Sequence, residues 1–228
     1  MKDKFDRVDE YPAKVLVKDL NSLGYKRVNM KSDQENALSA VVDATKVLWK
    51  GELVVEKSPK GESHSNGEVE RAVQTVHGLS RTLKVHLESY ARMSLDPKCP
   101  VLAWLIEYGA VLHMLFHTGV DGMTPYQRIK GKPWTIALPA FGECVEYKKR
   151  TRHKLDDRWD TGIYLGVKHD TTERIVGTST GCYVVQSIRR VPEDRRHDSQ
   201  MLASEEAYRG SRYPKAQKTR ESWNYLSR

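Results

Sequence analysis

Two stretches, NMKSDQEN at residues 29–36 and SHSNGEVERAVQTV at residues 63–76, decide how this chain is expected to fold. The first closes a short apolar and β-branched run and places Asp33 directly after it. The second opens a long helical pattern and places Glu70 one turn inside it. Carboxylates are the hard oxygen ligands that Mg²⁺ requires. Metal ions held in this way stabilise the attacking and leaving oxygens of a phosphodiester. We therefore predict that Asp33 and Glu70 bind a divalent metal ion.

Composition sets the broad class of the protein. The chain has 228 residues, of which 39% are hydrophobic and 30% are charged, enough for one good core and a second small one. Every long apolar run is interrupted by a charge or a histidine, so no membrane span is expected. Cys99, Cys144 and Cys182 lie far apart, which fits neither a disulfide framework nor a zinc site. We expect an intracellular protein from a reducing compartment.

Positive charge is concentrated in the last third of the chain. The formal net charge is +8, and residues 148–228 hold 18 Lys and Arg against 11 Asp and Glu. Such a region favours polyanions through counterion release. A solvated surface that keeps the protein soluble explains the same excess, and charge alone does not separate the two interpretations.

Periodicity predicts an α/β fold in which mixed helices and strands give way to short strands near residue 140. Helical spacing occurs at residues 4–23, 36–48, 66–90 and 99–116, and strand patterns occur at residues 25–30 and 52–56. After Pro139 short strand patterns follow at 141–148, 161–168, 174–176 and 181–191, which predicts a small antiparallel barrel-like module. We predict a core at 1–132, a linker at 133–140, the β-module at 141–195 and a charged tail with at most one short helix at 196–228.

The helix expected at residues 66–90 has one polar side that begins with an acid. Glu70 is followed on this side by donors and cations, whereas Val76 and Leu83 lie on the opposite side. A solvated face more often mixes both signs of charge, so this order favours a helix that lies along DNA. The residues predicted to contact nucleic acid here are Asn66, Gln74, Arg81 and Lys84.

Three further groups have both a functional and a structural interpretation. His113 and His117 are spaced to share a metal, but without a nearby third ligand packed histidines are favoured. The tyrosines and tryptophan of the β-module suit an aromatic cage, but core positions are favoured; they are Tyr147, Trp159, Tyr164 and Tyr183. A dense run of cations suits phosphate binding or a solvated loop, and both remain open; it comprises Lys148, Lys149, Arg150, Arg152 and Lys154.

Four segments in order resemble integrases of copia-type LTR retrotransposons and retroviruses. SDQEN at 32–36 is similar to the segment with the second catalytic aspartate, and SHSNGEVER at 63–71 to the one with the glutamate. TPYQRIKGKP at 124–133 resembles the copia-type segment after the core. KLDDRWDTGIYLG at 154–166 resembles the copia-type stretch that ends in glycine, hydrophobe, leucine and glycine. The resemblance covers roughly residues 1–195.

The resemblance implies a truncated RNase H-like core followed by a small β-barrel that binds DNA or chromatin. Asp33 and Glu70 would hold Mg²⁺ or Mn²⁺ for 3′-end processing and strand transfer, with element ends and target DNA as partners in the nucleus and a homo-oligomer as the assembly. The family motif selects Glu70 over Glu68, and the helix geometry agrees, because Glu68 faces away from the cationic side.

The chain also departs from the family pattern. It begins at the first helix of the core, so the strand with the first catalytic aspartate and the zinc-binding module have no counterpart. We therefore expect a fragment that is inactive alone in strand transfer. The alternatives are a nucleic-acid-binding remnant without catalysis and a structural adaptor whose β-module binds protein tails.

Overall fold

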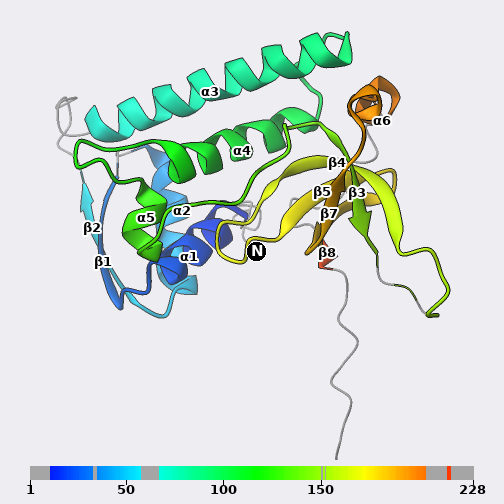
Figure 1. Cartoon of the computed structure of the whole chain (residues 1–228). Coiled ribbons are helices and arrows are strands. Elements are labelled where there is room, and N and C mark those ends of the chain that lie inside the picture. The colour runs from blue at the N-terminus through cyan, green and yellow to red at the C-terminus, as the bar shows by residue number, and fades with distance from the viewer. Residues whose placement is uncertain are drawn as a thin grey trace, which may run out of the picture. The chain divides into compact units, whose positions relative to one another are not determined.

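The computed structural model describes residues 11–32, 35–57, 67–149, 151, 153–203 and 215–216 (Figure 1). These residues form a mixed α/β fold with six α-helices, a two-stranded parallel sheet and a larger, mainly antiparallel sheet. The chain divides into two compact units, Met1–Ala72 and Val73–Arg228. The division falls inside a helix.

The first unit is a helix followed by a β-α-β arrangement. Its elements are α1 (Tyr11–Leu23), β1 (Arg27–Ser32), α2 (Asn36–Leu48) and β2 (Glu52–Lys57). β1 and β2 are parallel, in register from Arg27 opposite Glu52 to Ser32 opposite Lys57. A parallel pair needs a crossover between its strands, and α2 lies in that connection. The expected order of helices and strands is confirmed here.

Helices α1 and α2 pack through a small core with a polar tie. Leu20 and Val42 are buried, and the indole N–H of the buried Trp49 donates to the side-chain oxygen of Asn21 at 3.0 Å. Val47 belongs to the apolar spacing of residues 36–48, yet it is 86% exposed. Thr45 is fully buried instead, because its hydroxyl donates to the Val41 carbonyl and leaves no unpaired polar group.

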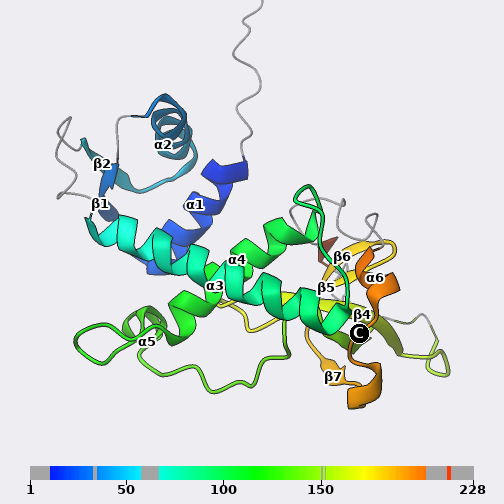
Figure 2. The ribbon, with the colours of Figure 1, turned by 90° about the horizontal axis from the view of Figure 1, so that it is seen from above.

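The second unit contains two long helices in close contact. α3 (Gly67–Ala91) begins in the first unit and continues here, and α4 (Val101–Phe116) passes beneath it in the view of Figure 2. A Cβ on Gly109 would lie 2.9 Å from the Ser80 hydroxyl oxygen, so the two helices approach each other closely at this glycine. The short helix α5 (Pro125–Lys130) follows.

The larger sheet is antiparallel across five strands. These are β3 (Cys144–Lys148), β4 (Trp159–Val167), β5 (Arg174–Thr178), β6 (Gly181–Val185) and β7 (Ile188–Arg190). The order is β7-β3-β4-β5-β6, and the two-residue strand β8 (Lys215–Ala216) joins β6 in parallel. The stretch at 181–191 was expected as one strand, but it forms two strands, β6 and β7, which lie at opposite ends of the five-stranded antiparallel order.

This sheet is strongly curved, yet it does not close. Val185 and Ile188 are three Cα steps apart and so span at most about 11 Å. In a flat sheet four strand spacings, about 19 Å, would separate β6 from β7. The sheet must therefore curl to bring its edges toward each other. Because β6 and β7 do not pair among the described residues, the expected barrel is corrected to an open sheet.

One hydrophobic core joins α3, α4 and the sheet. Its most deeply buried members include Leu87, Leu105, Ile163 and Tyr164. Leu202 of the short helix α6 (Ser199–Ala203) belongs to the same core and is 1% exposed, so the expected tail is packed at this point. A smaller cluster contains Leu115, Tyr126, Trp134 and Val167, which means that the expected linker at 133–140 also contributes to a core.

Candidate metal and nucleic-acid site

The two predicted metal ligands differ in what the structure describes. Glu70 is exposed in the first turn of α3. Asp33 lies outside the described residues, and so does Asn66. Ser32, the residue before Asp33, is the last residue of β1, at the carboxyl end of the parallel pair. Ligand sites of open α/β sheets lie outside the carboxyl ends of their strands, so Asp33 follows the strand end at which such a site is expected.

Glu68 shares the first turn of α3 with Glu70, and both side chains are exposed. Acidic side chains in the first turn also interact favourably with the helix macrodipole. That interaction accounts for an acid at either position, and it leaves the choice between them to a metal-binding measurement.

The polar side of α3 is only partly free to contact a ligand. Gln74 and Arg81, two of the residues predicted to contact nucleic acid, are exposed. Lys84 instead donates to Glu88 at 2.6 Å, and the same carboxylate accepts the Leu95 N–H at 2.8 Å. The hydrogen bond from Lys84 lowers the pKa of Glu88. Lys84 therefore neutralises an acid that holds the turn after α3.

The cation run after β3 is described at three of its five positions. Lys148 and Lys154 are exposed, and Lys149 is half-buried with its ammonium nitrogen 3.6 Å from an Asp160 carboxylate oxygen. Arg150 and Arg152 lie outside the described residues. Within the described part, then, one lysine is paired and two remain exposed to solvent.

An arginine that the sequence analysis did not single out lies over an aromatic ring. The guanidinium carbon of Arg189 is 3.6 Å from the ring centroid of Trp159, a close cation–π contact. Arg189 is opposite Glu146 on β3, and Trp159 is opposite Lys148 on the same strand. The pairing of β3 with both neighbours brings together residues thirty positions apart, so sequence spacing gave no signal for it.

The remaining aromatics of the β-module belong mainly to the core. Tyr147 and Tyr164 are buried, and Tyr183 packs against the same core. Burial raises the pKa of Tyr108 and of Tyr147 to about 12, since a phenolate loses its hydration there. The preference for core positions over a cage is confirmed for these tyrosines.

A buried carboxylate anchors the start of β3. Glu143 is 1% exposed, and its two oxygens accept hydrogen bonds of 2.7 Å each from the Arg190 guanidinium. The Ala140 N–H donates to it at 3.0 Å, and Arg196 lies 3.6 Å away. Burial raises the pKa of Glu143, but these donors and charges outweigh it, and the pKa is lowered. This ion pair joins positions 47 residues apart and was missed from the sequence.

The two histidines at the end of α4 pack against each other. The rings of His113 and His117 are stacked, with centroids 4.5 Å apart. Burial and the charge of His117 lower the pKa of His113. Among the described residues no three His, Cys, Asp or Glu side chains come together as a metal site.

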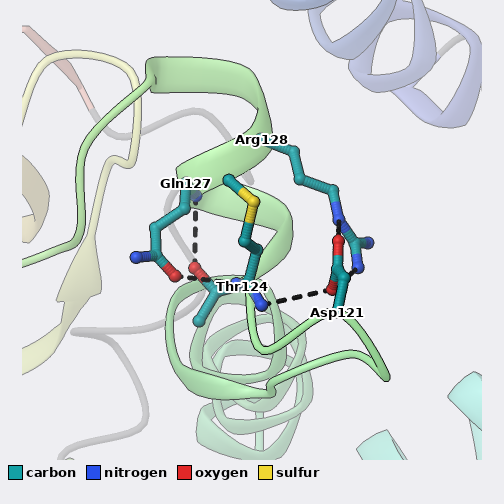
Figure 3. Close-up of polar contacts among 5 residues, drawn as sticks. Asp121, Thr124, Gln127 and Arg128 are labelled. Carbon is teal, nitrogen blue, oxygen red and sulfur yellow. Dashed lines mark hydrogen bonds and ion pairs between the residues drawn. The ribbon is translucent and has the colours of Figure 1, made fainter.

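The segment TPYQRIKGKP builds a short capped helix (Figure 3). Thr124 accepts the Gln127 N–H at 3.2 Å while the Gln127 side chain accepts the Thr124 N–H at 2.8 Å, a capping box. Arg128 forms two hydrogen bonds with Asp121, and Gly131 ends the helix at φ 69°. Thr124 is the N-cap of α5, so the motif has a clear structural role.

The glycines of the segment GIYLG are required by the sheet. A Cβ on Gly162 would approach the Gly177 carbonyl oxygen to 2.8 Å. Gly166 has φ 150° and follows an irregularity in the pairing of β4 with β5. Close strand approach and a bulge both favour glycine, so this motif too is explained by the fold.

Comparisons with known proteins identify no family for this chain. A scan against protein-family models matches none of them, and no curated protein matches significantly. In the part of the chain that the structure describes, every helix is too short or too polar to cross a bilayer.

Proposed function

We propose that this chain is an integrase-derived polypeptide of a copia-type retrotransposon that binds DNA and takes part in its integration. The proposal rests on one observation above the others. Asp33 directly follows Ser32 at the carboxyl end of the parallel β1–β2 pair, and Glu70 stands in the first turn of the helix that comes next after β2. This sequence of strand, acid, strand and acid-bearing helix suits a pair of carboxylates beside the carboxyl ends of the two strands, as the resemblance to integrases implies.

In this proposal Asp33 and Glu70 supply carboxylate oxygens to Mg²⁺ or Mn²⁺. The ion would polarise a phosphodiester and stabilise the oxygens that attack and leave. The exposed Gln74 and Arg81, further along α3, would hold the DNA strand near that ion. DNA is the partner, and a nuclear location follows from it.

Mn²⁺ binding followed by titration calorimetry tests the acid pair. Asp33→Asn and Glu70→Gln should each weaken binding at least about tenfold, because each removes one anionic ligand. Glu68→Gln in the same turn and Asp43→Asn on the exposed side of α2 are matched controls that should bind as the wild type does. Equal affinity in all five proteins would remove the metal assignment.

A second candidate function is nucleic-acid binding without catalysis. It is favoured by the exposed Lys148 and by the Arg189–Trp159 contact. These residues belong to the larger sheet and are distant in sequence from Asp33, so they could bind nucleic acid without the metal site. Gel shifts over a range of salt separate the two functions. Salt-sensitive binding without any effect of metal supports the binder. Metal-dependent joining of DNA ends that vanishes in Asp33→Asn or Glu70→Gln supports the enzyme.

A further inference from the structure

The outward face of the sheet carries two exposed cations and an aromatic ring that one of them covers, while the inward face is core. On β3 the side chains alternate, so the buried Val145 and Tyr147 point inward and Glu146 and Lys148 point to the other side. Arg189 and Trp159 are the register partners of these two outward residues on the flanking strands. Arg189 therefore reaches diagonally across β3 to stack on Trp159.

The two neighbouring arginines of β7 have different partners. Arg190, opposite Val145 in the register, gives both of its hydrogen bonds to the buried Glu143, although its side chain is 51% exposed. Arg189 is exposed, and none of the ion pairs among the described residues includes it. The same division holds at the end of β3, where Lys149, the residue after the strand, pairs with Asp160, whereas Lys148, the last residue of the strand, remains exposed.

Stacking leaves the donors of Arg189 available. At 3.6 Å the indole ring covers one flat face of the guanidinium, and the N–H groups lie in the guanidinium plane and not toward the ring. A phosphate accepts such donors in the plane as a bidentate pair. Because the ring already restricts the long side chain, less conformational entropy is lost when an anion binds.

We propose that Trp159 holds Arg189 as a binding group for the phosphodiester backbone of nucleic acid, with Lys148 as a second cation on the same face. This inference depends on the proposed nucleic-acid function and names its contact. Glu146 is the one acid on this face of β3, half-buried between the two cations, so the face keeps a net positive charge. β7 is the strand at the β3 end of this sheet.

The test is the affinity of the full chain for a fluorescent DNA duplex, measured by anisotropy over a range of salt. Arg189→Gln should weaken binding about tenfold and reduce the slope of log K against log salt by about 0.9, the loss of one phosphate contact. Trp159→Leu keeps every charge, so the affinity should fall several-fold while the slope stays the same. The double variant should bind no worse than Arg189→Gln alone, since the ring acts through the arginine.

Arg195→Gln is the matched control, because it removes one exposed arginine from η2 (Glu193–Arg195) outside this face. It should change the affinity less than Arg189→Gln does. Circular dichroism checks the fold, and Trp159→Phe, which keeps a ring, should retain more affinity than Trp159→Leu.

The outcomes separate this inference from the proposed function. Wild-type protein that binds DNA while the Arg189 and Trp159 variants match it in affinity and slope overturns the phosphate contact and keeps the function. Wild-type protein that binds no DNA at low salt overturns both. Displacement of DNA by polyglutamate at equal charge concentration would assign the face to acidic polypeptides and overturn the nucleic-acid assignment.

Discussion

Glu143 is the one charged side chain among the described residues that is almost fully removed from water. Both of its oxygens are bonded to Arg190, and Arg196 is close by. Removing one partner of such a pair leaves the other without its counter-charge, which costs about 3–5 kcal/mol in a buried site. Because the side chain of Arg190 is 51% exposed, water compensates part of that cost here.

We expect Glu143→Gln to lower the free energy of unfolding by about 3 kcal/mol at neutral pH. The pKa of Glu143 is lowered in the folded state, so its stabilising effect is present above the unfolded carboxyl pKa of about 4.3. It is lost as the pH falls through the folded pKa. The difference between variant and wild type should therefore shrink toward pH 3, as measured by urea unfolding. Glu146→Gln on the same strand is the control, and a constant difference at every pH would contradict this account.

At the scale of single elements, the short helix α5 depends on its caps. Thr124 and Gln127 satisfy each other's backbone N–H groups, and Asp121 binds Arg128 across the preceding turn. A helix of one and a half turns has few internal hydrogen bonds, so its ends contribute a large share of its stability.

Thr124→Ala should lower the free energy of unfolding by about 1 kcal/mol, since the Gln127 N–H loses its acceptor. Thermal unfolding measures the effect. Thr135→Ala, at an exposed threonine of the segment after α5, should change the melting temperature much less. Equal shifts in the two variants would mean that the capping box adds no stability.

The strand β4 has no room for a side chain at Gly162. Gly162→Ala should destabilise the protein by about 2 kcal/mol or more, because the new methyl group meets the Val176 side chain and the Gly177 carbonyl oxygen. Gly78→Ala in the middle of α3 is the opposite case, since nothing lies near its Cβ. It should stabilise the protein by about 0.5–1 kcal/mol. Denaturant unfolding of both variants measures whether the free energy of unfolding falls in Gly162→Ala and rises in Gly78→Ala. An unchanged free energy of unfolding in Gly162→Ala would show that β4 can shift to make room for the methyl group.

At the scale of the whole molecule, segments distant in sequence share one core in the second unit. Gly142 has φ 81°, and a Cβ at this position would meet both Leu87 of α3 and Leu202 of α6. The chain after the sheet thus packs against the C-terminal half of a helix more than a hundred residues earlier.

Leu202→Ala should lower the free energy of unfolding by about 2–4 kcal/mol, the usual cost of a cavity in a packed core. Gln200→Ala, on the exposed side of α6, should be close to neutral. Urea unfolding is the measurement. A neutral Leu202→Ala would mean that the segment after residue 196 behaves as the charged tail expected from composition.

Local patterns in the sequence determined most of the elements. The apolar spacing at 36–48 and 99–116 predicted helices that the structure places at Asn36–Leu48 and Val101–Phe116. Thr124 stands before a proline, a pattern typical of an N-cap, and Gly24 follows the helical spacing of residues 4–23, a position typical of a helix end; the structure has both, with Gly24 at φ 74°. These features depend on neighbours within a few residues, and therefore the sequence alone contains the information.

Only the tertiary structure decided the contacts between distant segments. The split of residues 181–191 into β6 and β7, the pairing of Glu143 with Arg190, and the stacking of Arg189 on Trp159 all follow from strand register. A shift of one residue would turn each of these side chains to the other face. The hydrophobic pattern of one strand cannot specify which strand pairs with it, because that choice is made by the packing of the whole core.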